Sequence, residues 1–287
     1  MAAPSLKSRF DNGEMIVAPG IYDMISALMA DRMGFKALYV TGYGTVASHL
    51  GLPDAGLATY TDMLTRVATM AKMTNTPVIA DADTGYGGLL NVHHTVRGYE
   101  DAGVSAIQIE DQEFPKKCGH TPGRRVVPIE EMVSKIEVAC DARRSQDFLI
   151  IARTDSRTTL GLEEALRRAE AYGKAGADIL FVESPESEEE MAEIGKRLDK
   201  PLVANMVPGG RTPVLSAERL KELGFSLVIH PAAGFLATAQ ALENSYKDIR
   251  DNGNVTDWSL LYDFEAFNKV IGFQQIWDFE KRYRDVV

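Results

Sequence analysis

The sequence predicts an α/β fold of the (β/α)8 barrel type, and two observations support this prediction. Short apolar runs rich in β-branched residues recur along the 287 residues, and a stretch with helical spacing of apolar residues follows each run. This alternation is typical of a parallel sheet covered by helices on both faces. Polar and charged residues stand at the ends of these runs, and in a barrel the strand ends meet on one face, where active sites lie. An open doubly wound sheet is the alternative, which would spread the same residues along a row.

Eight runs are expected to form strands, which is the number that a (β/α)8 barrel needs. In chain order they cover residues 16–20, 37–42, 77–85, 106–112, 148–155, 179–184, 201–207 and 227–232. Between them, MISALMADRM (24–33) and EEALRRAEAYGKAG (163–176) carry apolar residues at helical spacing. The second stretch ends in a glycine cap, and the AGVSAI and AGADIL segments each place a glycine just before a strand, as loops from helix to strand prefer.

The composition changes after residue 250, where aromatic side chains become frequent. These are Trp258, Tyr262, Phe264, Phe267, Phe273, Trp277, Phe279 and Tyr283. A closed barrel has little core left for them, so we expect them to pack on its outside or on another subunit. The sequence therefore predicts a catalytic barrel over 1–250 and a C-terminal helical extension over 251–287 that serves in oligomerisation.

Charge and composition exclude several kinds of partner. The formal net charge is −10, which argues against nucleic acid or an anionic membrane. No apolar run reaches membrane-spanning length, and the N-terminal stretch lacks the apolar centre of a secretory signal. Two cysteines are too few for a disulfide framework and suit a reducing compartment, so we expect a cytoplasmic protein. An anionic substrate would need a locally positive site.

Carboxylates stand at the ends of two neighbouring predicted strands. Asp81 and Asp83 are two residues apart, a spacing that directs both side chains to the same side of a strand. Glu110 and Asp111 end the next strand along the chain. A cluster of carboxylates without lysines among them favours Mg²⁺ or Mn²⁺ over zinc. Helix N-caps and solvent-facing acids are the alternative interpretation.

The segment PKKCGH (115–120) places a cysteine between cationic residues. Lys117 and Gly119 flank Cys118, and Lys116 and His120 are close by. Positive neighbours lower the pKa of a thiol, and such a cysteine can act as a nucleophile or as a general acid. A surface loop with an incidental thiol is the alternative. Cys140 lies in a predicted helix, where we expect a packed residue.

Positive charge on the same predicted face comes from Arg153 and from the segment PGGRTP (208–213), which contains Arg211. Arginine binds carboxylates with two parallel hydrogen bonds, so these residues are candidates for holding an anionic substrate. His93 and His94 are adjacent in a predicted helix and point in different directions, so we expect ordinary helix residues and no shared metal ion.

Residues 42–47 (GYGTVA) match the GxGxxA pattern of dinucleotide-binding sites. That pattern requires a helix directly after the strand, and we expect Gly51 and Pro53 to prevent one. We therefore interpret Tyr43 as an active-site hydroxyl held on a glycine turn, and a nicotinamide-dependent dehydrogenase as a weaker alternative.

The chain resembles the isocitrate lyase / phosphoenolpyruvate mutase superfamily over nearly its whole length. The resemblance is carried by TGYGTVASHLGLPDAGL, DADTGYGG, IEDQEFPKKCGHTPGRRVV, IARTDSR, VESPES and NMVPGGRTP. KKCGH after EDQ is similar to the lyase branch, whereas the phosphonopyruvate-forming mutases lack this cysteine. Tyr43 in TGYG resembles the group of 2,3-dimethylmalate lyase, oxaloacetate hydrolase and petal death protein more than methylisocitrate lyases.

The resemblance implies a Mg²⁺-dependent barrel that assembles as a dimer of dimers and exchanges its C-terminal helices between subunits. Asp81 and Asp83 match the metal site, with Glu110 and Asp54 acting mainly through metal-bound waters. Cys118 matches the general acid of a gating loop. The other implied site residues either are catalytic or bind substrate: Tyr43, Arg153, Glu183, His120, Thr41, Gly42, Lys117, Gly119, Asn205, Arg211 and Thr212.

The expected activity is cleavage of the C2–C3 bond of a 2-hydroxy dicarboxylate of the substituted malate type. An oxaloacetate hydrolase or decarboxylase and a methylisocitrate lyase are the alternatives. The eighth strand ends in His230, Pro231, Ala232 and Ala233, where lyases of this family often have Tyr-Pro-x-Ser. In oxaloacetate hydrolases that serine is associated with recognition of the hydrated keto group, so Ala233 disfavours oxaloacetate. A non-catalytic relative that only binds a metal and a diacid is a further alternative, against which the intact set of site residues argues.

Overall fold

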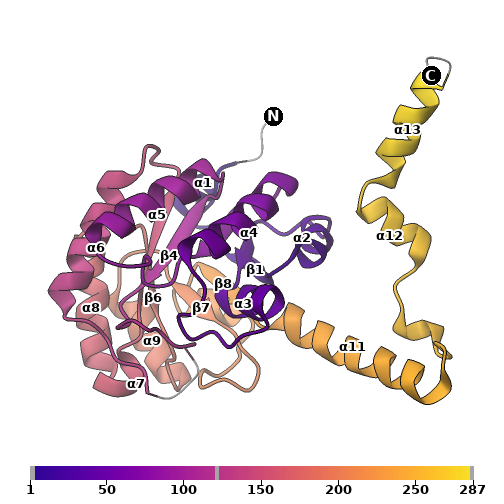
Figure 1. The fold of residues 1–287 in the computed structure, drawn as a ribbon. Coiled ribbons are helices and arrows are strands. Elements are labelled where there is room, and N and C mark those ends of the chain that lie inside the picture. The colour runs from indigo at the N-terminus through magenta and orange to yellow at the C-terminus, as the bar shows by residue number, and fades with distance from the viewer. Residues whose placement is uncertain (1–3, 120–122, 285–287) are drawn as a thin grey trace. The chain divides into compact units, whose positions relative to one another are not determined.

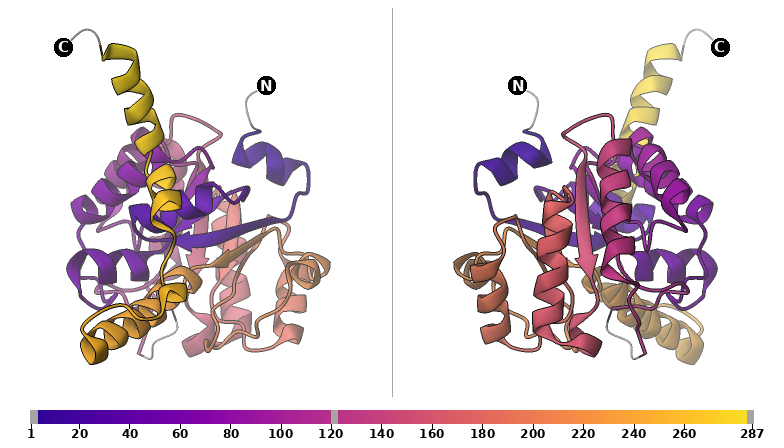
Figure 2. Two further views of the ribbon diagram at one scale, coloured as in Figure 1. Left: turned by 90° about the vertical axis from the view of Figure 1, so that its right-hand side faces the viewer. Right: turned by 90° about the vertical axis from the view of Figure 1, so that its left-hand side faces the viewer.

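Eight parallel strands form the centre of the computed structural model, which describes residues 4–119 and 123–284. They are β1 Ile16–Ile21, β2 Leu38–Val40, β3 Val78–Asp81, β4 Ala106–Glu110, β5 Leu149–Thr154, β6 Ile179–Val182, β7 Val203–Asn205 and β8 Leu227–His230. Seven of them lie within the predicted runs with shorter bounds, and β1 extends one residue beyond its run. Figure 1 shows the helices of the first 234 residues arranged around these strands, and Figure 2 shows the same from two further sides.

The strand order closes the sheet into a barrel. The order is β6-β5-β4-β3-β2-β1-β8-β7, with every neighbouring pair parallel. A parallel bridge between Leu180 and Leu202 joins the two ends, and the Leu180 amide donates to the Pro201 carbonyl at 2.9 Å. The (β/α)8 prediction is confirmed, and the open sheet is excluded.

Helices connect successive strands and cover the outside of the barrel. Their bounds are α2 Met24–Asp31, α3 Gly42–Leu50, α4 Tyr60–Met73, α5 Leu89–Asp101, α6 Ile129–Ala142, α7 Arg157–Leu160, α8 Leu162–Lys174, α9 Glu188–Arg197 and α10 Ala217–Glu222. A further helix, α1 Leu6–Asp11, precedes β1, and α11 Ala233–Asn252 follows β8. Local sequence signals begin several of them. Asp23 and Ser26 form a capping box at α2, and Thr59 and Asp62 form another at α4.

The strands separate two apolar cores. The inner core fills the barrel and includes Ile16, Tyr39, Ile79, Ile151 and Phe181, all almost fully buried. The outer core lies between the strands and the helices. Because side chains fill the interior, a substrate site has to lie at one end of the barrel, and polar residues gather at the carboxyl ends of the strands.

The expectation that no helix follows residues 38–40 directly is wrong. Helix α3 begins at Gly42, two residues after β2, and Gly51 ends it in a left-handed conformation (φ 65°). A glycine that ends a nine-residue helix does not prevent that helix. The GxGxxA segment is therefore a strand-to-helix turn, but it stands in a closed barrel and not in the open sheet of a dinucleotide-binding domain.

The chain divides into two compact units, one up to Gly234 and one from Phe235 onward. The second contains most of α11, a 3-10 helix η1 Trp258–Leu260, α12 Phe264–Val270 and α13 Phe273–Tyr283. Its large apolar side chains are strongly exposed, among them Trp258, Phe264 and Phe279. The predicted exchange of this segment between subunits stays a prediction. In the described ranges no helix is both long and apolar enough to cross a bilayer.

Candidate active site

A buried cluster of carboxylates and one lysine lies at the carboxyl ends of the first strands. Asp81 ends β3, and Asp83 follows it in a left-handed conformation (φ 48°). The ammonium of Lys116 is 2.5 Å from Asp54 Oδ1 and 2.6 Å from Asp83 Oδ1. Lys116 is only 3% exposed, and the three aspartates are also buried. The expectation of carboxylates without a lysine is therefore wrong, because the segment after β4 returns to this cluster.

Burial controls the protonation of this cluster. Loss of water raises the pKa of Asp83 to about 6, and Asp81 and Asp54 raise it too, against the opposing effect of the lysine. Burial acts to lower the pKa of Lys116, but Asp83, Glu110 and Asp54 outweigh it and hold this pKa well above its ordinary value. The lysine thus stays charged and compensates part of the negative charge around it.

The absence of a side chain at Gly42 leaves room for the carboxylate of Asp81. A Cβ atom at residue 42 would lie 2.6 Å from Asp81 Oδ2, closer than real contacts allow. The other oxygen, Oδ1, accepts a hydrogen bond of 3.0 Å from the Asp83 amide. Strand β3 ends at Asp81, so the alternation of side chains along a strand does not bring the carboxylates of Asp81 and Asp83 together. The turn from Asp81 to Asp83 does. Gly42 therefore lies against the aspartate cluster, and its role in substrate binding stays a prediction.

The oxygen donors of the cluster suit a hard divalent cation. In the described ranges no three His, Cys, Asp or Glu side chains are already gathered as metal ligands. The donor set nevertheless consists of carboxylate oxygens, which Mg²⁺ and Mn²⁺ prefer. Glu110 is 1% exposed, and its Oε1 accepts no hydrogen bond from the described residues. A buried acceptor without a donor fits a position that a cation or a metal-bound water would satisfy.

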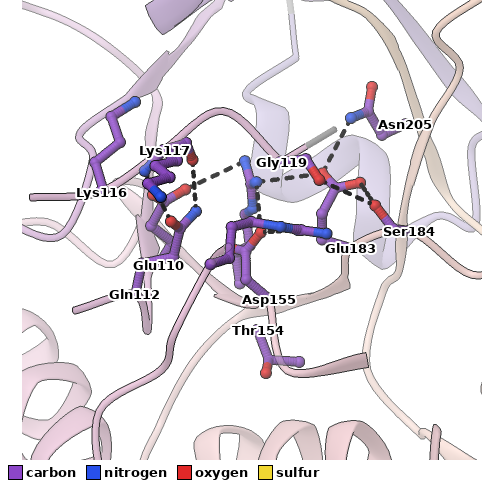
Figure 3. A network of polar contacts seen from close by, with 12 residues as sticks. Glu110, Gln112, Lys116, Lys117, Gly119, Thr154, Asp155, Glu183, Ser184 and Asn205 are labelled. Carbon is purple, nitrogen blue, oxygen red and sulfur yellow. Dashed lines mark hydrogen bonds and ion pairs between the residues drawn. The ribbon is translucent and has the colours of Figure 1, made fainter. Parts of the chain in front are cut away.

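Arg153 joins three carboxylates beside this cluster. Its guanidinium lies 3.3 Å from Glu110 Oε2, 2.9 Å from Asp155 Oδ1 and 3.4 Å from Glu183 Oε2. It also lies over the ring of Phe181, 5.2 Å from the centroid. Figure 3 shows Glu110, Asp155 and Glu183 close together, and they stand at or directly after the ends of β4, β5 and β6. Burial acts to lower the pKa of Arg153, but the three carboxylates outweigh it and raise this pKa well above its ordinary value.

Glu183 is held from its other side by two neutral side chains. The Asn205 amide donates to Glu183 Oε2 at 3.0 Å, and the Ser184 hydroxyl lies 3.1 Å from Oε1. The same hydroxyl lies 3.3 Å from the Gly119 carbonyl, as Figure 3 also shows. A Cβ atom at Gly119 would overlap the Arg153 guanidinium and lie tightly against Glu183, so a larger residue would have to displace these side chains. The predicted residues Arg153, Glu183, Asn205 and Gly119 are therefore neighbours.

Cys118 is presented by a segment with defined hydrogen bonds. Its amide donates to the Asp54 carbonyl at 3.2 Å. Gln112 accepts from the Lys117 amide at 2.9 Å and donates to the Lys117 carbonyl at 2.8 Å. Cys118 is half-buried between Lys116 and Gly119. The segment therefore brings Cys118 to the boundary between the aspartate cluster and the Arg153 network.

The other residues expected in the site take different positions. The Lys117 ammonium donates to the Gly123 carbonyl at 3.2 Å, and His120 lies outside the described residues. Thr41 is buried directly before α3, whereas Tyr43 on its first turn is 41% exposed. Arg211 is exposed, 3.5 Å from Glu186, and the neighbouring Thr212 is 5% exposed.

Asp111 does not join Glu110 in the cluster. It accepts hydrogen bonds from Tyr172 at 2.8 Å, from Thr154 at 2.7 Å and from Arg168 at 3.1 Å. Tyr172 and Arg168 belong to the outer helix α8, and Thr154 ends strand β5. Adjacent residues at a strand end point to opposite faces, which separates the two carboxylates. Asp111 therefore supports the wall of the barrel.

His93, His94 and Cys140 are confirmed as helix residues outside the site. Both histidines are exposed on α5, and the His94 ring packs 4.8 Å from the ring of Tyr60. Cys140 packs against the outer core from α6, and burial raises the pKa of its thiol to about 11.

Sequence reasoning missed Gln112 and Arg124. It counted Asp155 only among the polar residues at strand ends, and it gave Lys116 only the role of a cationic neighbour of Cys118. Each makes a buried polar contact with the site or with the segment that carries Cys118. The signal that could have found them is local. Asp155 directly follows β5, and Gln112 is two residues after β4. Lys116 and Arg124 stand within the same polar loop as Cys118.

Known proteins are similar to this chain over most of its length. A family model described as phosphoenolpyruvate phosphomutase matches residues 6–250. The chain belongs to the phosphoenolpyruvate mutase / isocitrate lyase superfamily. It is 46% identical to the 2,3-dimethylmalate lyase of Eubacterium barkeri over 282 residues, which is 98% of each chain. It is 42% identical to a 2-methylisocitrate lyase of Aeropyrum pernix, covering 98% of this chain and 90% of the relative.

The fold of this superfamily member also matches solved structures. The structure of an oxaloacetate acetylhydrolase in complex with 3,3-difluorooxalacetate superposes with a TM-score of 0.90 at 36% identity, covering 94% of this chain and 93% of that one. The predicted family is confirmed, and with lyases among its similar relatives the chain is a carbon–carbon lyase.

Proposed function

We propose that this lyase cleaves the C2–C3 bond of a 2-hydroxy dicarboxylate of the substituted malate type. The products are pyruvate or a related 2-oxo acid and a second carboxylate. The observation that carries the proposal is the position of Cys118, between a buried aspartate cluster and a buried arginine. The 46% identity to a 2,3-dimethylmalate lyase supports the substrate class.

We propose Mg²⁺ as the cofactor, with Mn²⁺ as a substitute. Asp81 and Asp83 would hold the ion, assisted by Glu110 and Asp54, whose carboxylates lie in the same buried cluster. When bound, the ion would polarise the substrate hydroxyl and stabilise negative charge on its oxygen. Lys116 keeps its positive charge beside Asp54 and Asp83, and this charge opposes the rise that burial causes in the pKa of Asp83.

The side chains around the cluster have distinct tasks. The Arg153 guanidinium offers a permanent positive charge for a substrate carboxylate, and Glu183 and Asn205 fix its position. Thr41, Gly42 and Tyr43 are proposed to bind the pyruvate-like end, and Gly119, Lys117, Arg211 and Thr212 to complete the substrate site.

Cys118 is proposed as the general acid. The substrate C2 hydroxyl gives its proton to water, and the C2–C3 bond breaks. The electron pair of this bond moves to the departing fragment, and C2 becomes the oxo carbon. The thiol of Cys118 then donates a proton to the carbanion of that fragment. We propose that His120, two residues further on, assists this proton transfer. A positioned general acid is typically worth about 10²–10⁴-fold in rate.

Oxaloacetate hydrolysis is the second candidate. Similarity to the oxaloacetate acetylhydrolase structure favours it. Ala233, however, begins α11 directly after the end of β8 and offers no hydroxyl. The similarity to a 2-methylisocitrate lyase makes a tricarboxylate a third candidate. Tyr43 would crowd the site for that larger substrate.

A substrate panel with Mg²⁺ tests the proposal. It contains malate, 2-methylmalate, 2,3-dimethylmalate, methylisocitrate, isocitrate and oxaloacetate, with release of 2-oxo acid followed by a coupled dehydrogenase and by NMR. We expect cleavage of an alkylated malate that EDTA abolishes. If the enzyme releases oxalate from oxaloacetate and cleaves none of the hydroxy acids, the proposed lyase reaction is wrong and oxaloacetate hydrolysis takes its place.

We also propose that the enzyme is a cytoplasmic homotetramer, assembled as a dimer of dimers through its C-terminal helices. Exposed aromatic side chains on η1, α12 and α13 support this assembly. Sedimentation at several protein concentrations tests the tetramer.

A further inference from the structure

Arg124 is a buried arginine that the proposed reaction does not use. Its side chain is 1% exposed. One guanidinium nitrogen, Nη1, donates to Asp155 Oδ1 at 2.6 Å, and Nη2 donates to Thr158 Oγ1 at 2.6 Å. Burying a charged side chain is costly unless it is paired and hydrogen-bonded, so an arginine held this way has a defined orientation.

The carboxylate that Arg124 binds also binds Arg153. Both guanidinium groups donate to the same atom, Asp155 Oδ1, Arg124 at 2.6 Å and Arg153 at 2.9 Å. Asp155 is fully buried, and its backbone amide donates to Asp111 at 2.8 Å, which holds this residue in place. Because both guanidinium groups bind one fixed oxygen, their positions are coupled. If one group moves, the electrostatic environment of the other changes.

The backbone connects Arg124 to the segment that carries Cys118. The stems of this loop pair with each other, since Gln112 and Val126 form an antiparallel bridge and the Glu113 amide donates to the Arg125 carbonyl at 2.9 Å. Gln112 also holds both the amide and the carbonyl of Lys117. The position of Arg124 is thus transmitted to Cys118 through a few short hydrogen bonds.

We propose that Arg124 is a positioning residue that couples the Cys118 segment to Arg153 through Asp155. The loop stem that Arg124 anchors then holds the Cys118 thiol at a defined position relative to the Arg153 guanidinium, which is proposed to bind substrate. The catalytic consequence rests on the proposed function of Cys118, whereas the coupling itself is a property of the folded chain.

Alkylation of the two cysteines tests the coupling without any substrate. The enzyme is treated with iodoacetamide, and mass spectrometry measures labelling of Cys118 relative to Cys140. Cys140 is an internal reference for general unfolding, because it packs in α6 and its pKa is raised to about 11. The variants are Arg124→Ala, Arg124→Lys and Thr158→Val. The matched control is Arg125→Ala, which removes the same charge from an exposed side chain paired with Glu113.

We expect Arg124→Ala to raise labelling of Cys118 by about tenfold, with labelling of Cys140 unchanged. Arg124→Lys restores part of the protection, because it keeps the charge but not the forked geometry, and Thr158→Val gives a smaller increase. Arg125→Ala leaves labelling as in the parent. If Arg124→Ala does not fold, Arg124→Lys and Thr158→Val decide the question.

Two outcomes overturn the proposal. One is an equal rise for both cysteines, which is general destabilisation, and the other is unchanged Cys118 labelling in every variant at Arg124 and Thr158. A kinetic readout follows with the active substrate from the panel. Coupling predicts that kcat falls about tenfold or more in Arg124→Ala and recovers partly in Arg124→Lys, with Arg125→Ala at the parental value. A changed labelling ratio with no lyase activity in the parent would instead sink the proposed function and leave the coupling intact.

Discussion

The Lys116 ammonium lies 2.6 Å from Asp83 Oδ1, and both side chains are almost fully removed from solvent. The lysine comes from the loop after β4, and the aspartate follows β3. This ion pair therefore ties the segment that presents Cys118 to the carboxylates that are proposed to bind the metal. Its removal changes charge, stability and the position of the loop together.

Lys116→Met is expected to lower both activity and stability. It leaves Asp54 and Asp83 buried beside each other without their positive partner, and breaking a buried pair costs about 3–5 kcal/mol. Thermal unfolding and steady-state kinetics measure the two effects. Lys117→Met is the matched control for stability, because its ammonium contacts the Gly123 carbonyl at an exposed position. Equal stability of the two variants would contradict this account of the cluster.

Cys118→Ala is expected to reduce kcat by about 10²–10⁴-fold while the enzyme still binds its metal and substrate. The reason is loss of the proton donor to the carbanion. Cys140→Ala serves as control, since Cys140 packs on the outer side of the barrel and is expected to change activity little. A Cys118→Ser enzyme as active as the parent would refute the acid role.

Gly42→Ala is expected to weaken metal binding. The new methyl group would stand 2.6 Å from Asp81 Oδ2 and displace that carboxylate. Gly88→Ala is the control, because residue 88 has open space around its Cβ position and an ordinary negative φ of −80°. Calorimetric titration with Mn²⁺ measures the affinity, and unchanged binding in Gly42→Ala would remove Asp81 from the metal site.

Asp248 is expected to make the turn after α11 sensitive to acid. Hydrogen bonds from the Thr256 side chain and from the Thr256 and Asp257 amides lower the pKa of Asp248 to about 2. A pKa below the ordinary 3.8 stabilises the folded turn above pH 3.8, and this stabilisation is lost as the pH falls through 2. Hydrogen exchange at the two amides measures it. Asp248→Asn should increase exchange at pH 6 but not at pH 2.

The aromatic extension is expected to hold the oligomer together. In α13 the rings of Phe273 and Trp277 lie 5.8 Å apart, and both side chains are more than 40% exposed. Phe273→Ser with Trp277→Ser should lower the sedimentation coefficient, because it removes apolar area from the proposed interface. Lys281→Ala on the same helix is the control. An unchanged tetramer in the double variant would place the interface elsewhere.

Several predictions from the sequence fail at turns. Asp83 was expected within a strand, but β3 ends at Asp81, and a left-handed residue sets the direction of the second carboxylate. Gly51 was expected to prevent a helix, but it caps one. In both places a single backbone conformation decides the outcome, and residue type constrains that conformation only weakly.

By itself, the sequence determined the parts that depend on local pattern. Apolar runs alternating with amphipathic helices define eight strands in a parallel barrel, and polar residues at strand ends define the face that carries the site. The PKKCGH segment likewise identified Cys118. These features follow from hydrophobic periodicity, which needs no knowledge of distant contacts.

Only the tertiary structure decided which charges meet. Lys116 reaches Asp54 and Asp83, Arg124 shares Asp155 with Arg153, and Asp111 turns away from Glu110. The physical reason is that a buried charge is stable only beside its partner, and that partner stands on another loop or strand. The number of residues between a charged side chain and its partner follows no regular spacing. The sequence therefore does not predict which charges pair, and the pairs form only when the barrel brings the strand ends together.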